Sequence, residues 1–298
     1  MVSGRTVEVD YEDSRRELNT DSGVLRYHEI GDGPPLLLLH GSGPGVTGWQ
    51  NYRGVVGELG EHFRCLILEF PGFGVSDPGD GHPMMMAGAS VGRFLDALEL
   101  GAVDVIGNSM GGIIGANVAI SEPHRVRRLV TIGGIGKALF SHGPSEGIKL
   151  LMEFTDDPTR AGLVRWLHSM VHDPAVVTEE SIEERWRLAT DPETLEIARR
   201  MYSSAAFAAN AAAAKEAKAT PYWAKLDRIQ APTLLTWGRD DRVSPVDMAM
   251  LPMRDIPRAE LHVLPDCGHW TMIEAREAWL SAVLAFLTRP ESADRTAV

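Results

Sequence analysis

The chain has 298 residues, 44% of them hydrophobic and 23% charged, which suits one large α/β domain with an insertion or two small domains. The formal net charge of -12 argues against nucleic acid and anionic membrane as partners. The first residues lack the apolar run of a signal peptide, and no segment reaches the ~18 apolar residues of a membrane span. We therefore expect a cytoplasmic protein.

Two cysteines, Cys65 and Cys267, are too few for a disulfide scaffold and do not have the spacing of a metal site. Because an isolated thiol behaves as a small apolar group, we expect both to be buried or partly buried.

The predicted elements begin with two alternating segments, 6–11 and 24–30, which are expected to pair as a hairpin. Short apolar runs then predict strands that are buried on both faces, at residues 36–39, 65–70, 103–107, 129–132, 232–237 and 261–264. Helical stretches lie between them, for example 91–100 and 112–120. Alternating strands and helices indicate an α/β fold with a doubly wound, mostly parallel sheet.

The alternation stops between residues 136 and 220, where the periodicity is helical. A helical insert in an open sheet lies over the carboxyl ends of the strands, where such folds bind ligands. We therefore predict a core in two parts (1–135 and 221–290), a helical lid (136–220) and a disordered polar tail (291–298). The Ala-rich segment 205–219 predicts a helix by propensity.

The lid contains large apolar side chains that either line a pocket or only pack the lid on the core. For any single residue, packing is the simpler interpretation. These residues are Met152, Phe154, Trp166, Met170, Trp186 and Met201.

A G-x-S-x-G pattern at residues 107–111 follows an apolar strand and opens a helix of small residues. This is the context of a nucleophile elbow, in which a strained turn exposes the serine hydroxyl. Ser109 is therefore the candidate nucleophile, and the next amide, of Met110, is a candidate oxyanion donor. The alternative is a glycine-rich turn with an incidental serine. The loop at 41–45 lacks the glycine spacing of a dinucleotide site, so no cofactor is predicted.

A serine nucleophile needs a base, and the base needs an orienting acid. His269 follows the last predicted strand, and two acids, Asp240 and Asp241, follow the strand before it. The order Ser, Asp, His is that of α/β-hydrolases. The rival base is His40, for which bracing the following loop is the favoured role. No histidine or cysteine cluster predicts a metal.

At this point the motifs resemble the meta-cleavage product hydrolases of the α/β-hydrolase fold, over residues 24–288. The likeness lies in the combination of a G-P-G loop, an asparagine before the serine, a lid Arg-Trp pair and a tryptophan after the histidine. The matching segments are HGSGPG at 40–45, PGFG at 71–74, GNSMGG at 107–112, PSEGIK at 144–149, RW at 185–186, WGRDDR at 237–242 and CGHW at 267–270.

The resemblance implies a substrate of the 2-hydroxy-6-oxo-hexa-2,4-dienoate type, made by extradiol ring cleavage, whose C5–C6 bond is split by water. Protonation at C5 first gives a ketone, so cleavage then releases a stabilised dienolate. That step needs a fixed carboxylate and a nearby acid–base group. The tail on C6 is left open, and a homodimer or larger homo-oligomer is implied.

By the same resemblance, Ser109 is the nucleophile, His269 the base and Asp241, the fourth residue of the G-x-x-D turn, its orienting acid. The amides of Ser42 and Met110 are implied to form the oxyanion hole. The residues implied to bind the substrate are Arg185, Asn108, Asn51, Trp270 and Gly43.

Two positions depart from the family pattern. Glu69 stands where aspartate is common and is expected to disturb the packing of its loop. Ser42 stands where many members have glycine, which is compatible because only its amide is needed.

Other functions use the same fold. The main alternative is a carboxylesterase or lactonase with the same triad, in which Arg185 would be a surface residue paired with Glu183 or Glu184. Dehalogenases and epoxide hydrolases would need an aspartate at 109. A non-catalytic binding protein would not need all three residues, and a cofactor-free dioxygenase is a remote alternative.

Overall fold

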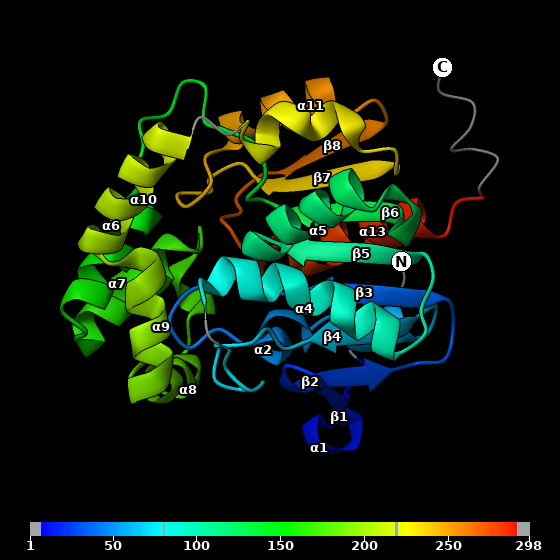
Figure 1. Cartoon of the computed structure of the whole chain (residues 1–298), viewed down its shortest axis with the longest axis horizontal. Helices are drawn as coiled ribbons and strands as arrows, with labels where there is room; N and C mark the ends of the chain where they lie inside the picture. The colour runs from blue at the N-terminus through cyan, green and yellow to red at the C-terminus, as the bar shows by residue number, and fades with distance from the viewer. Residues whose placement is uncertain (1–6, 80, 218–219, 291–298) are drawn as a thin grey trace.

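The computed structural model describes residues 7–79, 81–217 and 220–290. An eight-stranded sheet forms the centre of these residues (Figure 1). The strands are β1 (Arg15–Thr20), β2 (Gly23–Ile30), β3 (Pro35–Leu39), β4 (Arg64–Leu68), β5 (Val103–Asn108), β6 (Val126–Ile132), β7 (Thr233–Gly238) and β8 (Ala259–Leu264). Their order is β1-β2-β4-β3-β5-β6-β7-β8, and only the pairings of β2 are antiparallel. The predicted mostly parallel sheet is confirmed.

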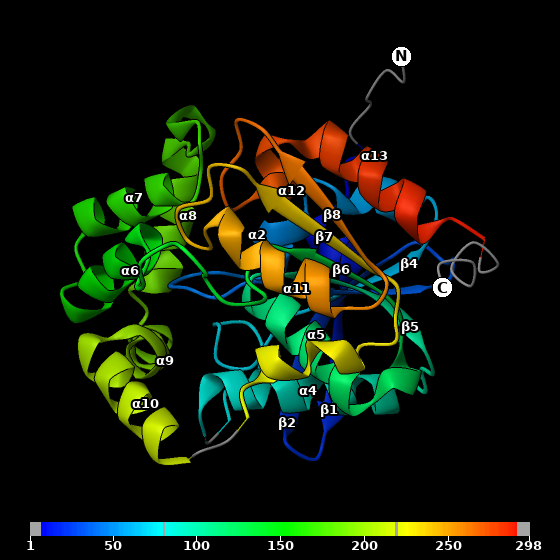
Figure 2. The same cartoon turned by 90° about the horizontal axis from the view of Figure 1, so that it is seen from above.

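Helices cover both faces of this sheet, as Figure 2 shows for α13 on one side and α4 and α5 on the other. Alternate leucines of β3 face opposite layers, because successive side chains in a strand point to opposite faces: Leu36 and Leu38 join one core cluster, Leu37 and Leu39 the other. The core helices are α2 (Gly48–Tyr52), α3 (Val56–Gly60), α4 (Pro83–Ala97), α5 (Met110–Ser121), α11 (Met250–Asp255), α12 (Thr271–Glu274) and α13 (Arg276–Leu287), with the short turns η1 (Pro123–Arg125), η3 (Tyr222–Arg228) and η4 (Val246–Ala249).

The helical insert is confirmed between β6 and β7. It consists of α6 (Glu146–Asp156), α7 (Arg160–Ser169), η2 (Pro174–Val176), α8 (Glu179–Ala189), α9 (Pro192–Tyr202) and α10 (Ser204–Ala217). Figure 1 shows these helices gathered at one edge of the sheet, beyond the arrowheads of the parallel strands. The predicted Ala-rich helix is α10, and the last two residues of its predicted range lie outside the described residues. We call the insert the lid.

The N-terminal strand was predicted in the wrong place. The partner of β2 is β1, at Arg15–Thr20, and Tyr11–Ser14 form a short helix, α1, capped by Asp10. Val9 packs against the core instead of pairing in a sheet. The sequence RRELNT has no apolar alternation because β1 is an edge strand with mostly exposed residues. Position 6 lies outside the described residues.

Three further predictions concern the cysteines, the C-terminal tail and membrane spans. Cys65 and Cys267 are buried and free, as expected. The predicted tail at 291–298 lies outside the described residues. Among the described helices, none combines the length and the apolar character needed to cross a membrane.

Glu69 does not disturb its loop, contrary to expectation. Its carboxylate accepts hydrogen bonds from the amides of Gly48 (2.7 Å) and Trp49 (2.8 Å), at the start of α2. The macrodipole of a helix favours an anion at this end. Burial still raises the pKa of Glu69 to about 7. The residue therefore fixes α2, which carries Asn51.

His40 braces the loop that follows β3. Its Nδ1 lies 2.6 Å from the carbonyl oxygen of Gly41, and its Nε2 accepts a hydrogen bond from the amide of Phe70 at 2.9 Å. This pattern requires the neutral imidazole with its proton on Nδ1. Burial lowers the pKa of His40 to about 4. The bracing role is therefore favoured over that of a base.

This geometry predicts a pH-dependent stability. The pKa of His40 is lower in the folded chain, so the unfolded chain takes up a proton first, and stability is lost as the pH falls from about 6.5 to about 4. The loss from this residue should be about 3 kcal/mol, from 1.36 kcal/mol per pKa unit. Urea unfolding across this range should show a flatter pH dependence for His40→Gln, although the variant is less stable at neutral pH. An unchanged slope would contradict the prediction.

Candidate active site

Ser109 lies on the turn between β5 and α5, with φ 51° and ψ -111°. Its amide donates to the carbonyl oxygen of Ile132 on β6 at 2.8 Å. A serine held at positive φ between a parallel strand and a helix is the geometry of a nucleophile elbow, in which strain exposes the hydroxyl. Met110 follows as the first residue of α5, so its amide is at the positive end of the helix.

The structure brings Asp241, and not Asp240, to His269. Oδ2 of Asp241 lies 2.7 Å from Nδ1 of His269, and both side chains are about 1% exposed. Oδ1 of Asp241 accepts the amides of Val243 and Ser244, each at 2.8 Å. These bonds keep the carboxylate aimed at the imidazole and place the imidazole proton on Nδ1, so that Nε2 is the basic nitrogen.

Two glycines after β6 lie between Ser109 and the acid–base pair. A Cβ on Gly134, at φ +81°, would lie 2.5 Å from the Cα of Ser109, and one on Gly133 would lie 3.2 Å from both Oδ2 of Asp241 and Cε1 of His269. The three candidate catalytic residues therefore surround this backbone, although they come from three different strand ends.

The loop at 41–45 packs beneath the lid. A Cβ on Gly43, at φ +130°, would lie 2.6 Å from the ring of Trp166 on α7. The hydroxyl of Tyr202 on α9 donates to Oγ of Ser42. The candidate oxyanion residue Ser42 is thus held by a lid side chain, and Gly43 occupies a space that only glycine fits.

Arg185 on α8 is a buried cation, only 7% exposed. Its guanidinium lies 5.5 Å from the centre of the Trp270 ring, and its Nη1 is buried with no hydrogen-bond partner among the described residues. Burial lowers its pKa to about 10. The alternative of a surface arginine is wrong, because Arg185 is buried. Among the described residues it forms no ion pair with Glu183 or Glu184, and Glu184 pairs with Arg53 at 3.2 Å. An unpaired buried charge is costly, so this site suits an anionic ligand.

A cavity of about 430 Å³ is lined by Asn51, Arg185 and Trp270 together with Leu167 and Met272. It lies between the core and α8, so three residues predicted to bind substrate share one space. Asn108 and Gly43, the other two, do not line this cavity, and neither do Ser109 and His269. Asn108 is connected to Asn51 through Gly41: a Cβ on Gly41 would be 2.7 Å from Oδ1 of Asn108, and Gly41 donates its amide to Oδ1 of Asn51 at 2.9 Å. Asn108 also donates to the carbonyl oxygen of Ile132 at 3.3 Å.

His172, Asp240 and Asp266 place potential metal-binding atoms within 4.8 Å of one another. However, Arg239 binds both aspartates, at 3.2 Å to Asp240 and 2.7 Å to Asp266. Its guanidinium already compensates their charge, so the cluster is better described as a salt-bridge network than as a metal centre.

Sequence reasoning missed four residues that shape this site: Tyr202, Glu274, Gly133 and Gly134. Glu274 contributes by accepting the amide of Gly268, next to His269, at 2.7 Å. Tyr202 and Glu274 reach it only through tertiary contacts and carry no local motif. The pair Gly133-Gly134 did give a signal, since two glycines directly after a predicted strand indicate a close approach of backbone segments at that point.

Comparisons with known proteins agree with this geometry. A family model described as "alpha/beta hydrolase fold" matches residues 34–276. A 2-hydroxy-6-oxononadienedioate/2-hydroxy-6-oxononatrienedioate hydrolase of Burkholderia vietnamiensis is 36% identical, over 89% of this chain and 91% of that protein. A 2-hydroxy-6-oxo-6-phenylhexa-2,4-dienoate hydrolase of Burkholderia cepacia is 33% identical, over 88% and 91%.

Solved structures of the same family are also similar to this chain. A meta-cleavage product hydrolase of Pseudomonas fluorescens superposes with a TM-score of 0.81 at 26% identity, over 91% of this chain and 97% of that one. A 2-hydroxy-6-oxo-6-phenylhexa-2,4-dienoate hydrolase of Rhodococcus gives 0.82 at 26% identity, over 92% and 98%.

The bond between Asp241 and His269 predicts which acid supports the base. Asp241→Asn should slow the reaction of Ser109 with a fluorophosphonate by on the order of 10⁴, because the amide favours the wrong imidazole tautomer. Asp240→Asn should change the rate less than about tenfold. Labelling rates for the two variants and the parent, with mass spectrometry to identify the modified serine, check this. A larger effect at Asp240 would reverse the assignment.

Proposed function

We propose, because this chain belongs to the meta-cleavage product hydrolase family of the α/β-hydrolase fold, that it hydrolyses the C5–C6 bond of a 2-hydroxy-6-oxo-hexa-2,4-dienoate formed in aromatic or steroid degradation. Relatives from Comamonas testosteroni and Burkholderia cepacia carry names for hydrolases of such substrates, with different tails. The proposal extends that chemistry to this chain and gives its residues their roles.

The observation that carries the proposal is the buried, unpaired guanidinium of Arg185. A dienoate carboxylate in the cavity would supply the missing partner of Nη1, and Arg–carboxylate contacts are strong when partly desolvated. Asn51 and Trp270 line the same space and would hold the 2-oxygen end of the substrate. Asn108, beside Ser109, would complete this subsite. A neutral ester would leave the cation unpaired.

In the proposed reaction His269 moves the proton that converts the dienol to its C5-protonated ketone. Ser109 then gives its hydroxyl proton to Nε2 of His269 and attacks C6, while the amides of Ser42 and Met110 hold the oxyanion. The C5–C6 bond breaks, its electron pair forms the dienolate, and the acyl group stays on Ser109. The dienolate takes the proton from Nε2 of His269 as it leaves, which restores the neutral base. Water, activated by His269, releases the acid. Asp241 keeps the imidazole in its working tautomer.

We also propose that the lid, residues 136–220, selects the tail on C6, and that the protein works as a homodimer or larger homo-oligomer. The lid proposal rests on Trp166 and Met170, both buried in the layer where α7 meets the core. The assembly proposal rests on the family likeness alone.

Arg185→Ala tests the substrate class. Loss of a partly desolvated Arg–carboxylate contact is worth roughly 2 to 5 kcal/mol, a ~30- to 5,000-fold fall in kcat/KM on a 2-hydroxy-6-oxodienoate. Hydrolysis of a neutral p-nitrophenyl ester should be nearly unchanged, because that substrate has no carboxylate to hold. The yellow dienoate is followed by absorbance and the acid product by mass.

Two results would contradict the proposal. Efficient ester hydrolysis without dienoate turnover by the parent enzyme would favour a carboxylesterase or lactonase. An equal loss on both substrates in Arg185→Ala would make Arg185 a structural residue of the lid.

Met170→Ala tests the role of the lid in tail selection. Met170 is 4% exposed, and the substitution removes only side-chain atoms, so the ratio of kcat/KM for phenyl and short alkyl tails should change by about tenfold or more. Met201→Ala, a buried lid methionine in the other core cluster, is the matched control and should leave this ratio unchanged. Equal losses for all tails, in step with a lower Tm, would show that Met170 only packs.

A further inference from the structure

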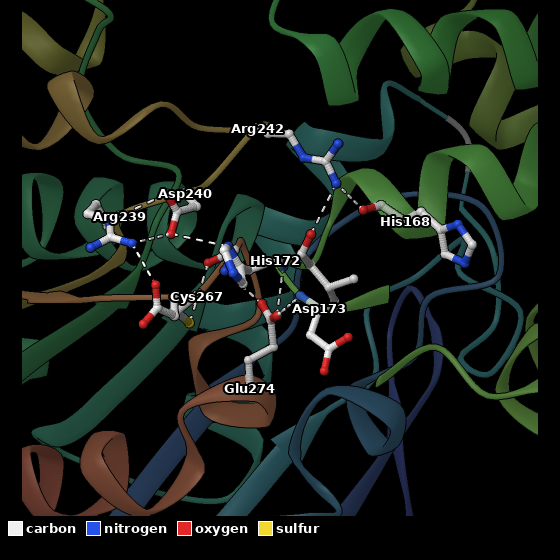
Figure 3. A network of polar contacts seen from close by, with 11 residues as sticks. His168, His172, Asp173, Arg239, Asp240, Arg242, Cys267 and Glu274 are labelled. Atoms are coloured by element: carbon white, nitrogen blue, oxygen red, sulfur yellow. Dashed lines mark hydrogen bonds and ion pairs between the residues drawn. The ribbon is translucent and has the colours of Figure 1, made fainter. Parts of the chain in front are cut away.

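The lid segment 168–173, which includes the last two residues of α7, lies directly against the two loops that carry the candidate acid and base. The amide of His269 donates to the carbonyl oxygen of Met170 at 2.7 Å. Arg242, next to Asp241, donates to the carbonyl oxygens of His168 and of Val171, the latter at 3.1 Å. Figure 3 shows Arg242 reaching these lid carbonyls on one side of the network.

Glu274, at the end of α12, joins the same segment to the base loop. Its Oε1 accepts the amides of His172 (2.7 Å) and Asp173 (3.0 Å), and its Oε2 accepts the amide of Gly268 (2.7 Å), as Figure 3 shows around the labelled carboxylate. One carboxylate therefore satisfies three amides from two segments about 100 positions apart in sequence. Hydrogen bonds to an ionised acceptor are roughly twice as strong as neutral ones.

These contacts close a ring around the base. It runs from the amide of His269 to Met170, along the lid backbone to His172, through Glu274 to Gly268, and by one peptide bond back to His269. The backbone of His269 is thus held on both sides, by Met170 and through its neighbour Gly268. Since Asp241 reaches only the imidazole, the ring supplies the fixed backbone from which that 2.7 Å bond is made.

We propose that Glu274 is a positioning residue: by clamping the lid segment 168–173 to the base loop, it sets the place of His269 relative to Asp241 and Ser109. The inference rests on the proposed role of His269 as base. It makes this part of the lid a fixed component of the catalytic frame, so any lid opening that admits substrate takes place elsewhere.

Glu274→Gln tests the clamp in the full-length enzyme. The amide keeps one acceptor oxygen and turns an NH₂ group toward a backbone amide, so one side of the clamp is lost with little change in size. Misplacement of a catalytic group by about an ångström costs up to ~100-fold. We expect kcat to fall about 10- to 100-fold, with KM changed less than about threefold. The fall should be the same on the dienoate and on a p-nitrophenyl ester, because both use the base.

Two further readouts separate positioning from stability. The low-field proton resonance of the His269–Asp241 hydrogen bond should broaden or shift in Glu274→Gln. Active-site titration with a fluorophosphonate should show a full complement of reactive sites that turn over slowly. Glu277→Gln, an exposed carboxylate three residues further on, is the matched control and should behave as the parent. If the glutamine variant does not fold, Glu274→Asp, which keeps both oxygens on a shorter stem, takes its place with a smaller expected loss.

The inference is overturned if folded Glu274→Gln, or Glu274→Asp in its place, keeps kcat within twofold of the parent. It is also overturned if the loss lies wholly in the number of active sites, or if the resonance is unchanged. Failure of the proposed function looks different: the parent enzyme would then turn over the ester and not the dienoate, and the clamp would be judged on ester turnover alone.

Discussion

The candidate site depends on one hydrogen bond, between the buried carboxylate of Asp241 and the imidazole of His269. The two residues leave different strands, and each loop would be free to move without further contacts. The parallel sheet brings the loops to one edge, the amides after Asp241 orient its carboxylate, and lid backbone holds the histidine. Because the lid backbone holds His269 in place, the insert is part of the structure that forms this hydrogen bond and not a separate cover over the site.

A second constraint is electrostatic. The chain carries a formal charge of -12, yet a buried guanidinium, that of Arg185, lines the candidate substrate cavity. Burial lowers the pKa of Arg185 although its guanidinium lies 5.5 Å from the centre of the Trp270 ring, within reach of a cation–π attraction. The free energy that is lost by burying this cation without a partner is regained when an anionic ligand binds beside it. An acidic protein can bind an anion selectively in this way.

The parts predicted from sequence were those that local patterns determine. Continuous apolar runs predicted the six parallel strands. The turn at Ser109 was predicted from the small residues around it, which allow the strand and the helix to approach closely. The choice of Asp241 over Asp240 came from a family pattern and not from physics, since both side chains follow the same strand. Glu274 and Tyr202 could not be found, because their roles exist only once distant segments have packed together.

The strand that the sequence concealed has a consequence for self-association. β1 ends the sheet with Arg15, Arg16 and Glu17, which are exposed and charged. Unpaired strand edges attract other strands and promote aggregation, and charged side chains are a common protection against it. β1 was difficult to predict because it has no apolar pattern. The same charged residues allow β1 to form an exposed edge of the sheet without pairing with further strands.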